Sequence, residues 1–523
     1  MKPERAWPRT VAAALLCGVA LLARAQSPAD TKAIDAAFDE VFERYRLPGM
    51  ALGIVEDGRV VYTRTAGELV AGGGDAVDSR TLFKIASNTK SMTTATLARL
   101  VDAGKLRWDD PVVKWLPQFR MNDAWVGQQM QVRDLLIHNS GLRAGAGDLM
   151  LWPEPNDFTR ADIVHGLAYL KPQRSFRSGY DYDNLMYIVA GEVAAAAGGA
   201  PYEALVRREV FAPLGMSRCQ VGEWSRRDVG NVAQPHMRQG ERNIPVRSDA
   251  DRVRASTMDP AGGVRCSLDD MLAWIKAWLA PPATTPAWLS KAQREAVWAP
   301  QMPMPVSQRM RDWDNSHFSA YGYGWRLADV DGVFKVSHTG TLMGMYSVAT
   351  MLPDKGVGFV VLINGEGEAA RTVLNQVLVT RYTQGSRAPS VAHYADLLER
   401  EDASRPANEK APDTSSRTRA TAAELAPRLG IYRDPWFGEV ALCRDRDAVR
   451  LRARKSPLLD GIVWRVGKRM LVDWDDDSVD AEAWLEFPGT PGGADLTMAK
   501  VDPQADFSYD YEDLAFARVG DCP

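Results

Sequence analysis

The sequence is poor in the residues that hold metals and lacks the charge that nucleic-acid binding requires. It contains six histidines and five cysteines, and no cysteine shows zinc-site spacing with a histidine. Binding to nucleic acid needs a basic face, whereas the formal net charge is -4. We therefore expect no metal site, no cofactor and no nucleic-acid partner.

The apolar run near the N-terminus is not of membrane-spanning length. It extends from Val11 to Leu22, which is too short to cross a bilayer. Three basic residues precede it, and a small-x-small site, Ala23-Arg24-Ala25, follows. This arrangement is typical of a secretory signal. We expect residues 1–25 to be a signal peptide cleaved after Ala25, with a periplasmic or secreted protein and no stable membrane insertion afterwards.

At 523 residues the chain is too long for one compact core, so we expect two domains. In residues 26–385, strand patterns at both ends flank a mostly helical middle. They comprise a hairpin around Asp57-Gly58 and the runs Tyr321–Leu327, Val333–Ser337, Tyr346–Leu352 and Val357–Ile363. Strands gathered at the two ends predict an α+β fold, with an antiparallel sheet flanked by helices and a helical lobe.

The C-terminal quarter has a different pattern. Residues 386–422 have few large apolar groups and predict a linker with room for one short helix. Residues 423–523 show short strands and turns, including an alternation of apolar residues and arginines from Val449 to Arg454. We interpret this part as a small β-barrel or sandwich, and the acidic cluster Asp473–Asp480 as a solvated turn facing the arginines rather than a Ca²⁺ site.

Export would make disulfides possible in this chain. The cysteines that follow the expected signal are Cys219, Cys266, Cys443 and Cys522, which permit three pairings. We favour Cys219–Cys266 and Cys443–Cys522, because each bridge then stays within one expected domain. Four free buried thiols are the alternative.

The sequence Ser87-Asn88-Thr89-Lys90 opens an apolar helical stretch. Three residues make almost one helical turn, so the Lys90 amine is expected beside the Ser87 hydroxyl. A serine becomes nucleophilic when a neighbouring base takes its proton, and a buried lysine with a lowered pKa can be that base. The helix N-terminus would present N–H groups to an oxyanion. The alternative for Ser-x-x-Lys alone is an ordinary helix surface.

Two further elements could complete such a site. Tyr182-Asp183-Asn184 precedes an expected helix, Leu185–Ala197. A Tyr182 phenol with a depressed pKa could relay the proton, and the Asn184 amide could orient Lys90 and bind a substrate carbonyl. Taken alone, these two residues would be capping and packing residues.

The third element is Ser337-His338-Thr339-Gly340-Thr341, expected between two strands. Gly340 would let a substrate backbone approach a sheet edge, and the Thr341 N–H could be a second oxyanion donor. His338 could bind a substrate carboxylate or protonate a leaving group. The alternative for His338 is a hydrogen-bonded structural residue.

Together the three elements resemble the motifs of class C β-lactamases, D-aminopeptidases, family VIII esterases and penicillin-binding-protein relatives. Those proteins carry Ser-x-x-Lys, then Tyr-x-Asn, then Lys-Thr-Gly or His-x-Gly. The stretches Val132–Leu142, Pro213–Met216 and Ala261–Gly263 also match. The resemblance covers about residues 30–385 and implies an α/β sandwich beside an all-α lobe, with the site between them. The C-terminal part, with Gly430-Ile431-Tyr432 and Tyr511–Leu514, resembles appended lipocalin-like domains.

The resemblance implies a role for each motif residue. Ser87 would be acylated, Lys90 and Tyr182 would handle its proton, and Asn184 would position Lys90 and substrate. The N–H groups of Ser87 and Thr341 would hold the oxyanion. His138, in the Val132–Leu142 stretch, is interpreted as structural. His338 departs from the lysine of β-lactamases, and a neutral histidine attracts a β-lactam carboxylate poorly.

We therefore expect an exported serine hydrolase that acts through an acyl-enzyme on a small-molecule or peptide substrate. Peptide amides, including those with D-residues, and esters are the favoured substrates, with β-lactams as the alternative. A non-catalytic scaffold that binds cell-wall peptides is a hypothesis of another class. The sequence leaves the oligomeric state open.

Overall fold

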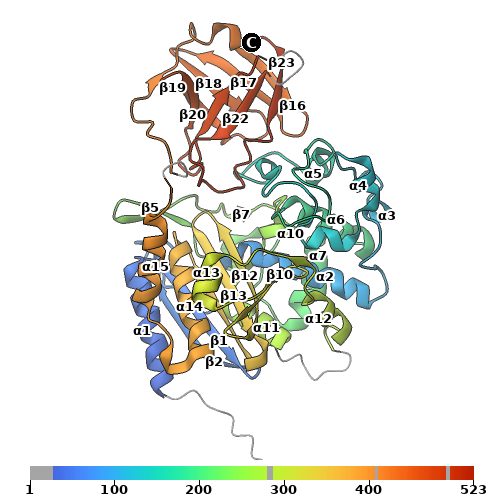
Figure 1. Ribbon diagram of the computed structural model, residues 1–523, viewed down its shortest axis with the longest axis vertical. Helices are drawn as coiled ribbons and strands as arrows, with labels where there is room; N and C mark the ends of the chain where they lie inside the picture. The colour runs from blue at the N-terminus through green and yellow to red at the C-terminus, as the bar shows by residue number, and fades with distance from the viewer. Residues whose placement is uncertain (1–27, 280–286, 407–409, 490–494) are drawn as a thin grey trace, which may run out of the picture.

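The hairpin predicted at Asp57-Gly58 opens the central sheet of the larger domain. The computed structural model describes residues 28–279, 287–406, 410–489 and 495–523. Within them, eight strands form one antiparallel sheet in the order β2-β1-β14-β13-β12-β11-β10-β9 (Figure 1). Their bounds are β1 Gly49–Glu56, β2 Arg59–Gly67, β9 Met302–Pro303, β10 Ser319–Tyr321, β11 Arg326–Val330, β12 Val333–Leu342, β13 Met345–Leu352 and β14 Val357–Ile363.

Both faces of this sheet are covered, because its central strands bury side chains on each side. In β1, Leu52 and Ile54 face one core, while Ala51 and Val55 face another. The first core is closed by α1 (Pro28–Arg44), α14 (Glu368–Gln384) and α15 (Val391–Ala403), which lie together in Figure 1. Helix α11 (Leu268–Leu279) packs on the other face. Alternate burial on two faces thus fixes the register of the sheet.

The helical lobe is inserted between β2 and β9, as the strand pattern predicts. Its longest helices are α2 (Thr89–Asp102) and α6 (Leu185–Gly198), which pack against each other. The other helical segments of the lobe are η1 Ala86–Asn88, α3 Val112–Trp115, α4 Ala124–Gln129, η2 Val132–Leu136, η3 Asp148–Met150, α5 Arg160–Gly166, α7 Tyr202–Val206, η4 Arg207–Phe211, α8 Ala212–Leu214, α9 Arg226–Val229, α10 Asp259–Gly262 and α12 Lys291–Val297. Helix α13 (Gln308–Asp314) follows β9, and its Trp313 packs in the core closed by α1, α14 and α15. Three short ladders complete it: β3 Phe83–Lys84 with β8 Arg265–Cys266, β4 Trp224–Ser225 with β7 Arg252–Val253, and β5 His236–Gln239 with β6 Arg242–Pro245.

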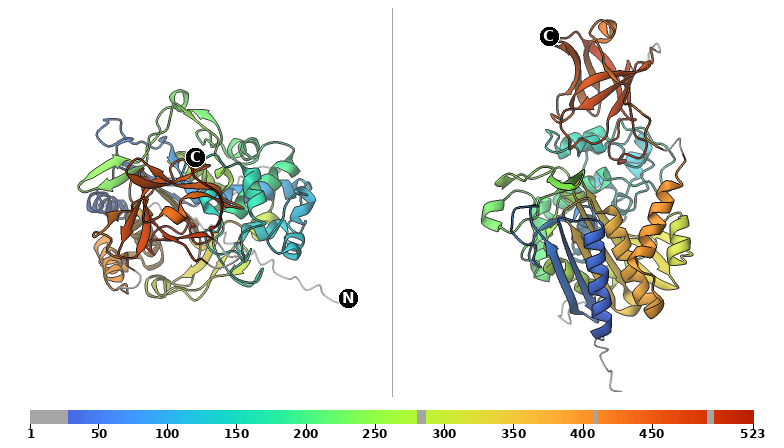
Figure 2. Two further views of the ribbon diagram at one scale, coloured as in Figure 1. Left: turned by 90° about the horizontal axis from the view of Figure 1, so that it is seen from above. Right: turned by 90° about the vertical axis from the view of Figure 1, so that its left-hand side faces the viewer.

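The C-terminal domain is a closed barrel that stands at one end of the larger domain (Figures 1 and 2). In the described residues, eight consecutive strands pair in chain order, and the ring closes because β19 pairs with β20 as well as β18, and β16 with β23. The bounds are β16 Gly430–Asp434, β17 Gly438–Asp445, β18 Ala448–Ala453, β19 Asp460–Val466, β20 Arg469–Trp474, β21 Ala483–Glu486, β22 Leu496–Lys500 and β23 Ala515–Gly520, with β15 Thr418–Arg419 added beside β19. Closure leaves no long free sheet edge.

The arginines of β18 pair with nearby acids. Val449 and Leu451 point into the barrel, while Arg450 pairs with Asp475 of the acidic cluster. This ion pair supports the interpretation of the cluster as a solvated turn rather than a Ca²⁺ site.

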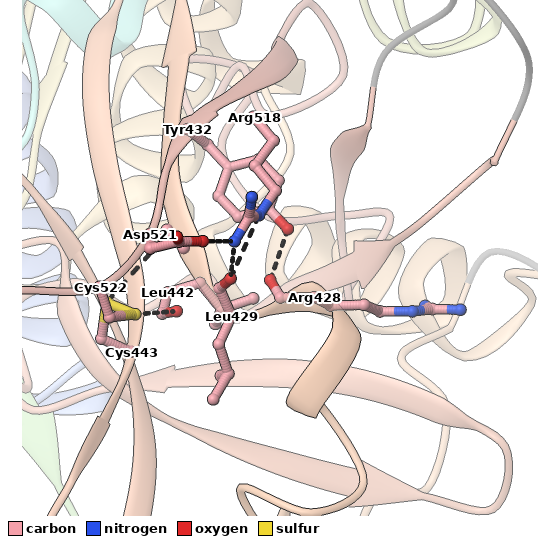
Figure 3. Close-up of a disulfide and its surroundings, with 9 residues drawn as sticks. Arg428, Leu429, Tyr432, Leu442, Cys443, Arg518, Asp521 and Cys522 are labelled. Atoms are coloured by element: carbon pink, nitrogen blue, oxygen red, sulfur yellow. Dashed lines mark hydrogen bonds and ion pairs between the residues drawn. A yellow bond between two sulfur atoms is a disulfide. The ribbon is translucent and has the colours of Figure 1, made fainter.

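Both favoured disulfides are confirmed. Cys219 is bonded to Cys266 in the helical lobe, and Cys443 on β17 is bonded to Cys522 in the C-terminal tail. Figure 3 shows that the second bridge lies beside a polar contact in which Arg518 donates to the carbonyl of Leu429 and pairs with Asp521. Each bridge therefore lies within one domain.

Two expectations concern segments that the sequence pattern places outside the folded cores. The expected signal peptide, residues 1–25, lies outside the described residues. The range 386–422 contains α15, whose Tyr394 is buried with its ring 5.0 Å from that of Trp313. That helix therefore belongs to the core of the larger domain. Among the helices that the structure describes, none has the length and apolarity needed to cross a membrane.

Candidate active site

Ser87 lies on a sharp turn between strand β3 and helix α2. Ala86 has a φ of +48°, a left-handed conformation that is strained for a residue with a side chain. The turn is pinned to β13, because Ser347 donates to the carbonyl of Ile85 (2.7 Å) and accepts from the Asn88 amide (2.8 Å). Ser87 itself is half-buried, whereas its neighbours Ala86 and Asn88 are buried. It belongs to the 3₁₀ turn η1, and α2 begins at Thr89, two residues later than expected.

Lys90 is fully buried beside Ser87. Its Nζ lies 3.0 Å from the Ser87 hydroxyl, 2.7 Å from Oδ1 of Asn184 and 2.9 Å from the carbonyl of Ala261. Its pKa is lowered from 10.5 to about 7, chiefly by burial and also by the positive charge of Arg326, while the carboxylates of Asp148 and Asp183 oppose the shift. A neutral amine can donate two hydrogens to Asn184 and Ala261 and accept the Ser87 proton on its lone pair. The geometry expected from Ser-x-x-Lys is present.

The second element forms a wall of the same site. Asn184 is the residue before α6 and Tyr182 lies over Lys90, whose Nζ is 4.9 Å from the centre of the phenol ring. The expected depressed pKa of Tyr182 is wrong. Burial raises that pKa to about 12, although the positive Arg326 and a hydrogen bond with Ser87 oppose the shift. Tyr182 is therefore a protonated phenol, and the base of the site is Lys90.

His138 holds this second element in place from the preceding loop. Its Nδ1 accepts the backbone N–H of Asp183 at 3.0 Å, and its ring lies 4.3 Å from that of Tyr182. Ser140 adds a hydrogen bond of 2.7 Å to the carboxylate of Asp183. The structural role expected for His138 thus consists of positioning the Tyr182–Asn184 turn.

The third element lies within a strand, not between two strands. Strand β12 continues to Leu342, and β11 pairs with it only as far as Ser337, so that residues 338–342 pair with β13 alone. The expected sheet edge therefore exists. Gly340 serves another purpose than substrate approach, because it faces the carbonyl of Ile85 and Ser347 Oγ at distances that leave no room for a Cβ. It lets β12 lie directly against the turn that carries Ser87.

Arg371 on α14 secures the end of this strand, and sequence reasoning missed it. Its Nη1 donates to the carbonyl of Gly340 (2.7 Å) and to Thr341 Oγ1 (2.8 Å). The side chain of Arg371 is almost fully buried. Thr341 is exposed at the site, and its N–H as the second oxyanion donor stays a prediction.

His338 does not present its ring to a substrate, which corrects the role expected from the sequence. It is fully buried, its Nε2 lies 2.8 Å from the hydroxyl of Tyr321, and its Nδ1 lies 2.7 Å from the carbonyl of Thr339. Burial and the positive charges of Arg326 and Lys90 lower its pKa well below 6.5. His338 is thus a neutral, hydrogen-bonded residue under the strand, which is the structural alternative.

Arg326 on β11 brings a fixed positive charge beside Tyr182, and it is a second residue that sequence reasoning missed. Its Nη1 donates to Thr339 Oγ1 at 3.1 Å, and its guanidinium carbon lies 5.7 Å from the ring centre of Tyr182. Arg326 belongs to none of the three motifs, so only the pairing of β11 with β12 reveals that it faces them.

Replacing Gly340 with alanine is expected to lower the hydrolysis rate about 100-fold. The added Cβ would force β12 away from the Ile85 carbonyl, and a displacement of about 1 Å between reacting groups costs roughly that factor. Overpacking should also lower the free energy of unfolding by about 1–3 kcal/mol. Steady-state kinetics and thermal unfolding check this. The control is Gly520→Ala, where the Cβ meets open space. Wild-type kinetics for Gly340→Ala would contradict the role given to the glycine.

Comparison with known proteins identifies the family of the larger domain. The family model described as Beta-lactamase matches residues 34–381, which is about two thirds of the chain. The chain belongs to the beta-lactamase family.

Relatives in this family have varied names. Penicillin-binding protein 4 of Amycolatopsis lactamdurans is 29% identical over 63% of this chain and 84% of its own length. Esterase EstB of Burkholderia gladioli is 30% identical over 63% of this chain and 88% of its own length. An unguisins hydrolase of Aspergillus campestris is 27% identical over 63% of this chain, which spans only 62% of that relative.

Similarity to a solved structure extends beyond the family domain. The octameric penicillin-binding protein homologue from Pyrococcus abyssi superposes with a TM-score of 0.58 at 20% identity, covering 90% of this chain and 98% of that one. The coverage shows that the solved structure shares the overall architecture, since the family domain alone accounts for about two thirds of this chain.

Proposed function

We propose that this beta-lactamase-family protein is an exported serine hydrolase that forms an acyl-enzyme on Ser87. The observation that carries the proposal is the 3.0 Å contact between Ser87 Oγ and the Nζ of Lys90, a buried amine with a pKa of about 7. A surface lysine would be protonated at neutral pH and could not act as a base. The two disulfides support export, because such bonds persist in oxidising compartments.

The reaction follows from the contacts in the site. Neutral Lys90 takes the proton of Ser87 while the serine oxygen attacks the substrate carbonyl carbon. The N–H groups of Ser87 and Thr341 stabilise the oxyanion that forms. The proton then passes from Lys90, with the protonated Tyr182 phenol beside it, to the departing amine or alcohol. Water attacks the acyl-enzyme in the second half, and Lys90 takes a proton from that water and returns one to Ser87.

Esters and peptide amides, including D-residue peptides, are the proposed substrates. The third element provides no cation, because His338 is neutral and buried. A second candidate, β-lactam hydrolysis, is favoured by Arg326, a permanent positive charge close to Tyr182 that could pair with a substrate carboxylate.

A labelling experiment tests the acyl-enzyme. The purified protein is incubated with a fluorophosphonate, digested and analysed by mass spectrometry, and the adduct is expected on the peptide that carries Ser87. An adduct on another serine, or none, would overturn the proposal. Turnover of p-nitrophenyl esters, of D- and L-aminoacyl p-nitroanilides and of nitrocefin then separates the substrate classes. Labelling without turnover of any of them would favour the non-catalytic scaffold.

Activity should rise with pH through about 7. Lys90 must be neutral to accept the Ser87 proton, and its pKa of about 7 means that the protonated, inactive form accumulates as the pH falls below that value. The acid limb of kcat/KM for a p-nitrophenyl ester, measured between pH 5 and 9, is therefore expected near pH 7. A kcat/KM that is still rising steeply at pH 9, as the ordinary lysine value of about 10 would give, would show that burial does not lower the pKa of Lys90.

A further inference from the structure

Asp148 is a buried carboxylate that belongs to none of the three motifs. A single residue, Asn184, connects it to Lys90 by hydrogen bonds. Asp148 is fully buried at the start of η3. Its Oδ2 accepts from Nδ2 of Asn184 at 2.7 Å, and Oδ1 of the same Asn184 accepts from Lys90 Nζ at 2.7 Å. The contacts thus form a chain from Asp148 through Asn184 to Lys90 and Ser87.

This chain determines which way the Asn184 amide faces. An amide presents an oxygen on one side and two N–H donors on the other. A carboxylate at Asp148 only accepts, so it selects the orientation in which the oxygen faces Lys90. The reversed amide would place its N–H donors against those of the lysine and would leave Nζ without that acceptor. Asp148 therefore holds the amide from the side opposite Lys90 and favours the same orientation as the lysine does.

The barrel domain supplies the other contact to Asp148. Ser508, in the segment between β22 and β23, donates to the same Oδ2 at 2.8 Å. In the same segment, Asp510 accepts the backbone N–H of Gly147, and Asp513 pairs with Arg143 at 3.0 Å. The barrel therefore lies directly on the loop that carries Asp148, over residues 143–148.

The same barrel segment also touches Tyr182. The ring of Phe507 meets that of Tyr182 edge-on, with 5.7 Å between the ring centres. The backbone carbonyl of Phe507 also approaches Gly145, where a Cβ would not fit. A second domain thus contributes to the wall of the site, far along the chain from the three motifs.

We propose that Asp148 is a positioning residue that orients the Asn184 amide, and through it Lys90, and that the C-terminal barrel holds Asp148 in place through Ser508. This inference rests on the proposed function, since it gives Asp148 a part in the activation of Ser87. It makes the barrel a component of the active site rather than an independent appendage.

Several charged and titratable groups surround Lys90 and must be included in any pH argument. Those that act on it, or on which it acts, are Asp148 on η3, Asp183 before α6, Arg326 on β11, His138 in the loop after η2, His338 on β12, and the phenols of Tyr182 and Tyr187. Negative charge at Asp148 raises the pKa of Lys90, although burial raises the pKa of Asp148 itself well above 3.8. Removing this carboxylate while keeping its shape should therefore lower the pKa of Lys90.

The experiment compares two substitutions at Asp148 by the rate of fluorophosphonate labelling and its pH dependence. Asp148→Leu removes the acceptor for Asn184 and is expected to slow labelling of Ser87 by roughly 10- to 100-fold, the usual range for residues that orient a functional group. Asp148→Asn keeps an amide oxygen that can accept from Asn184 and should restore most of the rate. The acid limb of labelling in the Asp148→Asn variant should move to lower pH, because loss of the negative charge lowers the pKa of Lys90.

The role of the barrel is tested with a matched pair of serines. Ser508→Ala should slow labelling by roughly 3- to 10-fold, the value of one lost hydrogen bond. Ser478→Ala is the control, because the Ser478 hydroxyl also contacts the larger domain, through Arg247 at 3.3 Å, but lies outside this network. Ser478→Ala should label at the wild-type rate, and an equal loss in both serine variants would overturn the role given to Ser508.

Other outcomes would overturn the role given to Asp148. These are an Asp148→Leu variant that labels at the wild-type rate, or an Asp148→Asn variant whose pH profile superimposes on that of the wild type. A purely structural role could slow labelling in Asp148→Leu but would not move the acid limb in Asp148→Asn. Failure of the proposed function is distinguishable, because the wild-type protein itself would then show no adduct on Ser87.

Discussion

Replacing Ser87 with alanine is expected to abolish fluorophosphonate labelling and to lower kcat by a factor of roughly 10⁴ to 10⁶. The serine oxygen is the atom that forms the acyl bond, and no other side chain in the described site takes its place. Lys90 Nζ is 3.0 Å from it, and the strained turn at Ala86 packs against β12. Ester hydrolysis and labelling followed by mass spectrometry measure the effect.

The matched control for this substitution is Ser91→Ala on the same helix. The Ser91 hydroxyl donates to the carbonyl of Asn88 at 2.7 Å and has no part in the proposed reaction. It should label like the wild type, with only a small loss of stability. Retained turnover in Ser87→Ala, with circular dichroism unchanged, would mean that another residue is the nucleophile.

Replacing Lys90 with methionine is expected to slow hydrolysis by about 10² to 10⁴, the usual contribution of a general base. Methionine keeps much of the volume of the side chain but cannot accept the Ser87 proton. The substitution should lower activity but raise the free energy of unfolding. A lysine whose pKa is lowered from 10.5 to about 7 destabilises the fold at pH 7, because the unfolded chain binds the proton more tightly. The cost is on the order of 4 kcal/mol.

Lys90→Met therefore should lose activity while keeping or raising its Tm at pH 7. Part of the stability gain is offset, because the acceptors on Asn184 and Ala261 lose their donor. Lys84→Met is the control, because it makes the same substitution close by, on β3, three residues before Ser87. Scanning calorimetry and ester kinetics check both. A Lys90→Met protein that loses activity together with many degrees of Tm would indicate a structural role for the lysine.

Much of the larger domain follows from local patterns. The hairpin at Asp57-Gly58, the strands β13 and β14 and the helix after Asn184 form close to where they are expected, because alternation of apolar residues and turn chemistry are local properties. Cysteine pairing also followed from the domain division. The end of β12 was missed, because Gly340 and the polar residues around it interrupt the apolar alternation.

The candidate site was predictable only in part. Ser87, Lys90, Tyr182 and Asn184 come together as the spacing and the family resemblance imply. The charge states of the titratable side chains could not be obtained from the spacing or from the family resemblance. The pKa of Tyr182 depends on burial by neighbours from several elements, and the same burial makes His338 neutral and inaccessible.

The sequence by itself determined the chemistry that is available: a serine and a lysine one helical turn apart, followed by a tyrosine, an asparagine and a glycine-containing strand in the family order. These are short-range features, so they can be read without the fold. Only the tertiary structure decided which groups act on that pair. Arg326, Arg371 and Asp148 lie far from Ser87 along the chain, and sheet pairing and domain packing bring them to it. Burial, which lowers the pKa of Lys90 to about 7, is likewise a property of the packed molecule.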